Sequence, residues 1–281
     1  MKFMRVGPVG HEKPCVQDKD GVWRDLSQIV KDINTVSIGP ALKASVANAD
    51  LSTLPVVDAT QQRIGSPMAQ PRNIYCIGLN YSDHAAEAGL PVPPEPIIFS
   101  KASGTFCGPN DSVLFSPAMT KLDWEVELGI VIGKAALNIS EDEAEDHIFG
   151  YCVVNDVSER AWQMERAGQW IKGKSFPSFC PTGPWLVTTE DVPDPEALDL
   201  WLDVNGISRQ KGSTSKMIFS PKHIVAYMSQ FCRLEPGDLI CTGTPPGVGA
   251  GMTPPLYLKI DDEIRLGIQG LGEQHQHVVA L

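Results

Sequence analysis

The sequence is short of positive charge. Its 281 residues contain 23 Lys and Arg against 34 Asp and Glu, which gives a formal net charge of −11. A chain this acidic repels phosphate backbones and anionic lipid, so we expect neither nucleic acid nor a membrane as its partner. It also repels anionic small molecules. An enzyme that acts on one therefore needs a local cation, either a metal ion or a placed Lys or Arg.

Long apolar runs are also missing. No stretch approaches the roughly 18 residues that span a bilayer, and Met1–Pro14 holds no apolar segment of signal-peptide length. The seven cysteines stand singly and form no CxxC pair, so a zinc site is not expected. Several lie inside apolar runs, as Cys76 and Cys152 do, and are expected to be buried. Unpaired cysteines fit a reducing compartment, and we expect a cytoplasmic protein.

The pattern of apolar and polar residues changes near Pro71. This change predicts a small N-terminal domain over residues 1–70 and a larger domain, the body, over residues 71–281. In the first part, Asp18–Gly21 predicts a turn within a hairpin over Val16–Leu26, followed by a helical stretch near Leu26–Ile33. No group of residues in this part converges on chemistry.

The larger body has many short apolar runs separated by turn signals. Predicted strands are Ile74–Leu79, Ile97–Ser100, Val113–Phe115, Trp124–Ile132, Tyr151–Asn155, Trp185–Thr188, Leu200–Val204, Leu239–Thr242, Tyr257–Ile260 and Glu263–Ile268. Predicted helices are Ser82–Ala88, Ser140–His147, Ser158–Glu165 and Pro221–Phe231. Because strands outnumber helices and do not alternate with them, we expect a β-rich α+β fold.

Gly168–Ser175 matches the nucleotide-binding pattern GxxxxGK[ST] letter for letter. That motif needs a buried strand before it and a helix after it, because the helix N-terminus holds the phosphates. The preceding residues are helix-like, and three prolines follow within ten residues. We therefore reject a nucleotide site, which leaves Lys174 in need of another role.

The strongest chemical signal lies in Trp124–Ile132. With a period of two, Glu125 and Glu127 lie on one strand face and the other face is apolar. Such a pair is either the solvated face of an edge strand or a site bridged by a cation. Asp156, at the end of the apolar run from Tyr151, favours the second interpretation. Three carboxylates suit Mg²⁺ or Mn²⁺, so Glu125, Glu127 and Asp156 are the predicted metal ligands.

Two other segments carry candidate functional groups. On the helix from Ser82, His84 and Glu87 are three residues apart and share a face. The pair is either a general base held by a carboxylate or an exposed His with an incidental neighbour. A proline-rich stretch from Pro91 follows, which suits a mobile lid. The glycine-rich segment Thr242–Gly249 could hold an anion on its N–H groups or form a tight connection.

Taken together, these segments resemble the fumarylacetoacetate hydrolase family. The resemblance covers nearly the whole chain after Pro71. The matching motifs are Asn80–His84, Glu125-x-Glu127, Val154–Asp156, Gly173–Phe176 and Thr242–Gly249, in family order. The resemblance to this family implies a β-roll fold, a small N-terminal domain, a homodimer and a Mg²⁺ or Mn²⁺ ion bound by the three acids.

The resemblance also implies residue roles. His84 and Glu87 would act in catalysis, as would Lys174. Substrate contacts are implied for Asn80, Tyr81, Gln163, Lys174 and Thr244. The chain departs from many members in having Leu79 in place of Arg and Pro177 in place of Asp.

Within the family, Asp123–Gly129 and Gly270–Gln274 look most like a subgroup that cleaves 2,4-diketo-3-deoxy sugar acids, such as the L-fuconate and L-rhamnonate derivatives. The expected reaction is metal-dependent hydrolysis of a C–C bond in a 2,4-dioxo acid, giving pyruvate and a short hydroxy acid. Alternatives on the same site are decarboxylation of oxaloacetate and isomerisation or decarboxylation of a dienedioate. Members of this subgroup have often been labelled ureidoglycolate lyase, so that activity is a further alternative. A non-catalytic metal-binding scaffold is the remaining one. Specificity is expected from Leu90–Pro96 and the loop after Phe176.

Overall fold

The computed structural model describes residues 1–87, 89 and 91–281. Its larger sheet contains β1 (Lys2–Val6), β2 (Lys13–Gln17), β3 (Trp23–Asp25), β4 (Ile64–Gly65), β5 (Ile74–Gly78), β6 (Ile97–Lys101), β10 (Val126–Ile132), β11 (Ile148–Asn155), β14 (Leu186–Thr188) and β17 (Leu239–Cys241). The second sheet contains β8 (Val113–Phe115), β15 (Asp199–Val204), β16 (Ile207–Ser213), β18 (Glu263–Ile268) and β19 (Gly272–Ala280). Two short pairs join β7 (Phe106–Cys107) to β13 (Cys180–Pro181) and β9 (Leu122–Asp123) to β12 (Ser158–Glu159).

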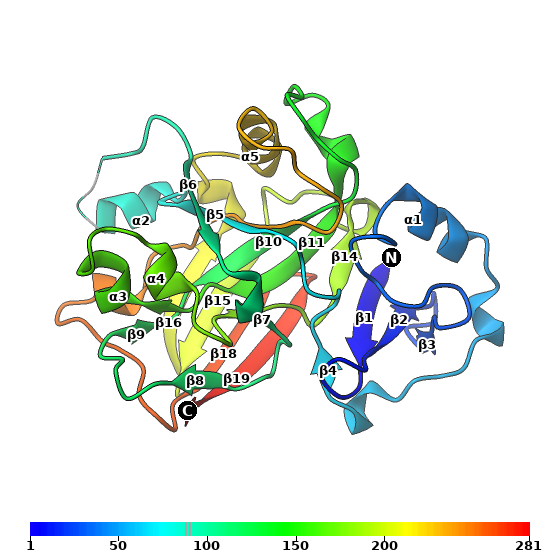
Figure 1. Cartoon of the computed structure of the whole chain (residues 1–281), viewed down its shortest axis with the longest axis horizontal. Coiled ribbons are helices and arrows are strands. Elements are labelled where there is room, and N and C mark those ends of the chain that lie inside the picture. The colour runs from blue at the N-terminus through cyan, green and yellow to red at the C-terminus, as the bar shows by residue number, and fades with distance from the viewer. Residues whose placement is uncertain (88, 90) are drawn as a thin grey trace.

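The helices are few and short, and most of them lie at the margins of the sheets (Figure 1). They are α1 (Pro40–Ala47), α2 (Ser82–Glu87), α3 (Arg160–Met164), α4 (Ile171–Lys174) and α5 (Pro221–Met228). Figure 1 places α2, α3 and α4 together at one end of the molecule, opposite the N-terminal strands. Among the described residues, no helix is long and apolar enough to cross a membrane.

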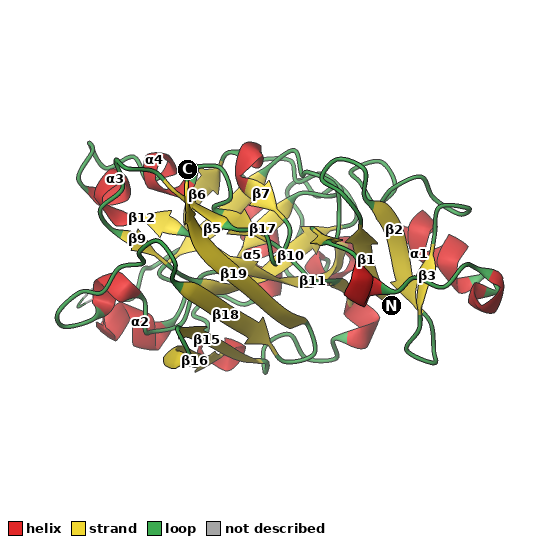
Figure 2. Cartoon of the chain, turned by 90° about the horizontal axis from the view of Figure 1, so that it is seen from below, coloured by secondary structure: helices red, strands yellow, loops and turns green. Residues whose placement is uncertain are grey.

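The two sheets stack on each other, as Figure 2 shows. The larger sheet runs in the order β3-β2-β1-β14-β11-β10-β17-β5-β6, with β4 beside β1. β10 therefore lies in the middle, antiparallel to both β11 and β17. This central position excludes the interpretation of the Glu-rich strand as a solvated sheet edge.

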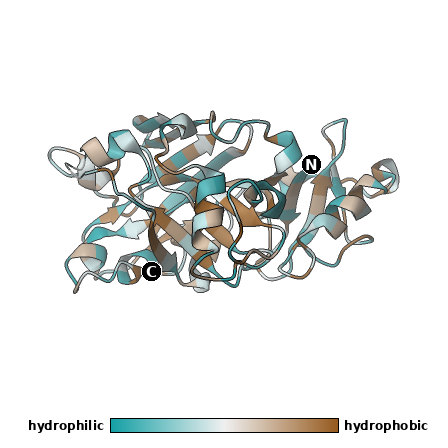
Figure 3. Ribbon diagram, turned by 90° about the horizontal axis from the view of Figure 1, so that it is seen from above, coloured by the Kyte–Doolittle hydropathy of each residue, from teal (hydrophilic) through white to brown (hydrophobic). Residues whose placement is uncertain are grey.

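Apolar side chains fill the space between the sheets. Val126, Leu128 and Ile130 of β10 are fully buried there, together with Leu202 and Leu266 of the second sheet. Figure 3 shows the corresponding concentration of hydrophobic residues on the inner strands. Fully burying one such side chain contributes about 1.5–3 kcal/mol, so this layer anchors β10. The alternation predicted for β10 is confirmed, and it turns Glu127 away from this core.

The N-terminal strands extend the larger sheet, because β1 pairs with β14. The predicted hairpin is confirmed as β2 and β3, with Cys15 opposite Asp25. The helix predicted near Leu26–Ile33 is wrong: this segment forms turns, and the helix is α1, farther along the chain. The division into domains at residue 70 stays a prediction.

Other predicted elements differ in detail. The helix predicted at Ser140–His147 is a short 3₁₀ turn at Ala144–His147, and Tyr257–Ile260 forms no strand. Two polar strands, β16 and β19, escaped prediction because most of their buried positions hold glutamines, Gln210, Gln274 and Gln276, so the sequence shows no apolar alternation there. Two predictions touch residues outside the described part of the chain: Ala88 at the end of the lid helix, and Leu90 among the specificity residues.

Candidate metal centre and active site

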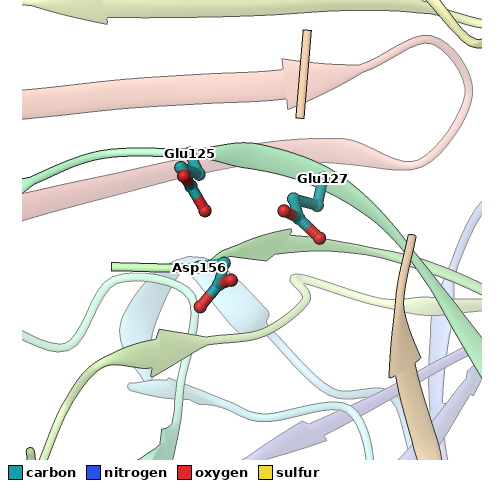
Figure 4. A group of neighbouring side chains, drawn as sticks. All are labelled: Glu125, Glu127 and Asp156. Atoms are coloured by element: carbon teal, nitrogen blue, oxygen red, sulfur yellow. The ribbon is translucent and has the colours of Figure 1, made fainter. Parts of the chain in front are cut away.

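Three acidic side chains from two strand ends converge at the margin of the larger sheet (Figure 4). Glu125 precedes β10, Glu127 lies in β10, and Asp156 follows β11. One ligand oxygen from each lies within 4.8 Å of the others, and all three residues are buried. The antiparallel ladder causes this convergence, because Val126 is paired with Asn155 and the Asp156 N–H donates to the Glu125 carbonyl.

Three cations surround two of these acids. Lys174 Nζ lies 2.6 Å from both Glu125 Oε2 and Asp156 Oδ2. Arg160 Nη2 lies 2.6 Å from Glu125 Oε1, and Lys101 Nζ pairs with the other oxygen of Asp156. Because these groups are buried, each unpaired charge would cost several kcal/mol, and the pairing offsets that cost.

Glu127 has no such partner. Among the described residues it forms no ion pair, and its Oε2 accepts one hydrogen bond, from the Gly243 N–H at 2.8 Å. Burial, together with the charges of Asp156 and Glu125, raises the pKa of Glu127 well above its ordinary value. Burial acts in the same direction on Glu125, but Arg160 and Lys174 outweigh it and lower its pKa.

This arrangement fits a divalent cation. Three clustered carboxylates are a hard-oxygen ligand set of the kind Mg²⁺ and Mn²⁺ prefer. One of the three, Glu127, forms no ion pair with any described basic residue, and the charge of Lys174 offsets only part of the repulsion from the other two acids. A bound cation would offset the rest.

The predicted catalytic pair lies beside this centre. His84 Nδ1 lies 2.9 Å from Glu87 Oε2, and the two side chains are 12% and 24% exposed. The Gly247 N–H donates to Glu87 Oε1 at 3.0 Å, so the glycine-rich loop holds the carboxylate that orients His84. His84 and Glu87 therefore form a hydrogen-bonded pair held by the loop, and their catalytic role stays a prediction.

One cavity of about 400 Å³ joins the groups. Its lining includes His84, Glu125, Glu127, Gln163, Lys174 and Thr244, with aromatic residues Phe99, Trp170 and Tyr257. The volume lies within the usual range of small-molecule sites. The structure thus brings two of the three predicted catalytic residues, His84 and Lys174, to one space with two metal ligands and with Gln163 and Thr244. Glu87 and Asp156 do not line this cavity.

The remaining predicted substrate contacts lie elsewhere. Asn80 is fully buried. Its side-chain N–H groups donate to the main-chain carbonyls of Phe219 and Thr242, and its Oδ1 accepts from the Phe219 N–H. Tyr81 is also fully buried, and its hydroxyl has no hydrogen-bond partner in the described part of the chain. Neither lines the cavity, so the structure gives both a packing position beneath α2 and leaves their substrate role a prediction.

The side chains of Gln163 and Thr244 differ in whether their polar groups are available to bind a substrate. The Thr244 hydroxyl donates to the Val126 carbonyl and accepts from Gln210, so its polar group is engaged. The side-chain oxygen of Gln163, Oε1, accepts from Arg160 Nη1 at 3.1 Å. The side-chain N–H groups of Gln163 have no partner among the described residues. Gln163 is therefore the better placed of the two to donate to a substrate.

The segment Gly168–Ser175 forms no nucleotide loop. It contains α4 and follows α3 with no strand between them, as predicted. Lys174 has the carboxylates as its partners instead.

Sequence reasoning missed Lys101 and Arg160. Both carry a signal: Lys101 ends a short apolar strand, and Arg160 is the first residue of a helix beside the acidic cluster. A lone basic residue at such a position predicts a buried partner.

Comparisons with known proteins agree with this site. Residues 73–279 match the family model "Fumarylacetoacetate (FAA) hydrolase C-terminal". A relative from Burkholderia lata, whose name specifies no more than a hydrolase, is 51% identical over 99% of this chain and 98% of its own.

Solved structures resemble the whole chain. Fumarylacetoacetate hydrolase from Exiguobacterium antarcticum is 35% identical with a TM-score of 0.88, each chain being covered to 100%. 2-Hydroxyhepta-2,4-diene-1,7-dioate isomerase from Mycobacterium marinum is 30% identical with a TM-score of 0.78, covering 100% of this chain and 98% of that one. Maleylpyruvate hydrolase from Sphingobium sp. SYK-6, in complex with manganese(II) and pyruvate, is 28% identical with a TM-score of 0.81, covering 100% and 99%. This chain belongs to the fumarylacetoacetate hydrolase family.

Proposed function

We propose that this protein is a metal-dependent hydrolase that cleaves the C3–C4 bond of a 2,4-dioxo acid to give pyruvate and a second carboxylic acid. One observation carries the proposal: Glu125, Glu127, His84 and Lys174 line the same cavity. Asp156 completes the acidic cluster, with a ligand oxygen within 4.8 Å of those of the two glutamates, and Glu87 holds His84. Glu125, Glu127 and Asp156 would hold Mg²⁺ or Mn²⁺. When bound, such an ion supplies Lewis acidity and a positive charge for the anionic 2-oxo acid end of the substrate.

His84 would take the proton of the attacking water. Glu87 fixes the imidazole through Nδ1, which leaves Nε2 as the basic nitrogen. Glu87 is in turn held by the Gly247 N–H, so the base is oriented through the glycine-rich loop. A general base held in this way contributes about 10²–10⁴-fold to the rate.

Lys174 would stabilise the oxyanion that forms at C4. Two of its three N–H groups point to Glu125 and Asp156, and one remains for a substrate oxygen. The water hydroxyl adds to C4, the C3–C4 bond breaks, and the electron pair moves into the 2-oxo group. The proton taken by His84 is returned to C3, so that water and substrate balance the two products.

Turnover of defined 2,4-dioxo acids tests the proposal. The protein is stripped with EDTA, reloaded with Mg²⁺ or Mn²⁺, and given 2,4-dioxopentanoate or the L-fuconate derivative 5-hydroxy-2,4-dioxohexanoate. We expect metal-dependent pyruvate release, with ¹⁸O from labelled water in the second acid. Metal binding without turnover of any 2-oxo acid would contradict the proposal and support the scaffold interpretation.

A second candidate is isomerisation or decarboxylation. Its support is the Mycobacterium marinum neighbour, which is named as a dienedioate isomerase and has the same fold. Such reactions need no water at a carbonyl, so carbon dioxide release or double-bond migration without ¹⁸O incorporation would favour them. Oxaloacetate and ureidoglycolate belong in the same substrate panel, since both were expected alternatives. The homodimer stays a prediction, to be tested by sedimentation.

A further inference from the structure

The cavity contains one cation that the reaction does not use. Three described basic residues other than His84 line it: Lys121, Arg160 and Lys174. Arg160 is committed to Asp123, Glu125 and Gln163, and Lys174 to Glu125 and Asp156. Lys121 alone is partnered by an exposed group, Glu165, and its own side chain is 37% exposed.

Lys121 lies within reach of the reacting end. It is four residues before Glu125, and four residues of extended chain span at most about 13 Å. The Arg160 N–H donates to the Lys121 carbonyl at 2.9 Å, which ties its backbone to the residue that pairs with Glu125. Tyr257 lines the cavity near the Lys121 ammonium.

The pair with Glu165 is easily exchanged. Exposed ion pairs contribute little to stability, because water screens them and two long side chains lose freedom. The pairing raises the pKa of Lys121, so the ammonium stays charged at neutral pH. An incoming carboxylate can therefore replace Glu165 without leaving a buried charge unpaired.

The part of the substrate beyond C4, its tail, would lie against the other residues of the cavity. These residues offer few hydrogen-bond partners to a tail that carries hydroxyl groups. Much of the lining is apolar or aromatic, including Ile77, Phe99, Met164, Trp170 and Val248. The Gln163 amide could bond one hydroxyl, but sugar hydroxyls placed against the apolar lining would lose hydrogen bonds to water without regaining them. A tail with an apolar middle and a terminal charge has no such loss.

We infer that Lys121 is a specificity-determining residue that binds a second carboxylate at the far end of the substrate, with Glu165 as its counter-ion in the empty site. The inference rests on the proposed function and narrows its substrate class to 2,4-dioxo acids with an anionic tail. Hydrolysis then yields pyruvate and a dicarboxylic acid.

Three substrates of graded tail chemistry test it: 2,4-dioxoheptanedioate, its neutral analogue 2,4-dioxoheptanoate, and 5-hydroxy-2,4-dioxohexanoate. Pyruvate release by the metal-loaded protein gives kcat and KM for each. We expect the lowest KM for the dioate. In Lys121→Met its KM should rise about tenfold or more at similar kcat, with the neutral acid unaffected. Glu165→Gln should lower the KM of the dioate.

Lys172→Met is the matched control, because it removes an exposed lysine that does not line the cavity. Equal KM values for the dioate and the neutral acid in the wild type would overturn the inference and leave the proposed function intact. A Lys121→Met effect of the same size on both substrates would overturn it too. Absence of pyruvate from all three would instead defeat the proposed function, and this inference with it.

Discussion

At the scale of single residues, the site separates its acids by their partners. Glu125 and Asp156 are neutralised by Lys174, Arg160 and Lys101, whereas Glu127 is not. The chain therefore retains one incompletely compensated carboxyl, Glu127, at the position where a cation would bind. Function here conflicts with the stability of the metal-free protein, as is common at active sites.

Glu127→Gln should stabilise the metal-free protein and weaken metal binding. The folded-state pKa of Glu127 lies above its ordinary value, so the folded state keeps a proton that the unfolded state releases between the two pKa values. Wild-type stability therefore falls as pH rises through this window, and the variant avoids that loss. Denaturant unfolding in EDTA should show the difference at neutral pH and not below the ordinary pKa of Glu.

Calorimetry of the same variant should show metal affinity reduced by at least about 10–100-fold, the loss typical of removing an outer-shell partner. Unchanged affinity would remove Glu127 from the ligand set.

His84→Ala should reduce turnover by about 10²–10⁴-fold with little change in metal affinity, because the base is lost and the acids remain. His223→Ala is a matched control, since His223 Nδ1 also pairs with a glutamate, Glu141, at 3.2 Å but lies away from the cavity. Similar kcat values for the two variants would contradict the role of His84.

At the scale of elements, the position of Lys174 depends on how closely α4 approaches α3 and β12. A Cβ on Gly173 would lie 2.4 Å from the Glu159 carbonyl oxygen and 2.5 Å from the Gln163 nitrogen. Only a residue without a side chain allows this contact. The glycine of the apparent nucleotide motif thus serves helix packing.

Gly173→Ala should force α4 away from α3, costing about 1–3 kcal/mol of stability and displacing the Lys174 ammonium from its two carboxylates. We expect a lower thermal midpoint and a loss of kcat. Gly104→Ala serves as the control, because nothing lies within 4 Å of its added Cβ. If Gly173→Ala matched Gly104→Ala in both thermal midpoint and kcat, the close approach of α4 to α3 would not be needed for stability or activity.

At the scale of the whole molecule, the ligands come from two strands of one sheet and their cationic partners from three other segments. An unfolded chain cannot hold them together, so a metal that binds here binds the folded state. Binding and global stability are then linked by mass action.

Mg²⁺ or Mn²⁺ at 100 times its Kd should stabilise the wild type by about 2.7 kcal/mol. For a chain of this size the thermal midpoint should rise by several degrees, because each kcal/mol shifts it by roughly 2–4 °C. Scanning calorimetry with and without EDTA measures the shift. Glu127→Gln should show about half of the shift or less at the same concentration, because its affinity is at least about tenfold lower. An equal shift in both proteins would place the ion elsewhere.

The sequence by itself determined the chemistry that was available. Alternation in Trp124–Ile132 separated Glu125 and Glu127 from an apolar face, and β10 keeps that separation. Spacing on a short helix paired His84 with Glu87. These features are local, because a strand or a helix turn fixes which side chains share a face.

Tertiary structure decided which of these residues meet. Ladder register brought Asp156 to Glu125, and the contact at Gly173 delivered Lys174 from the other side. The same packing buried Asn80 and Tyr81 away from the cavity and recruited Lys101 and Arg160. No local pattern encodes these outcomes, because they depend on the stacking of two sheets whose strands are distant in the sequence.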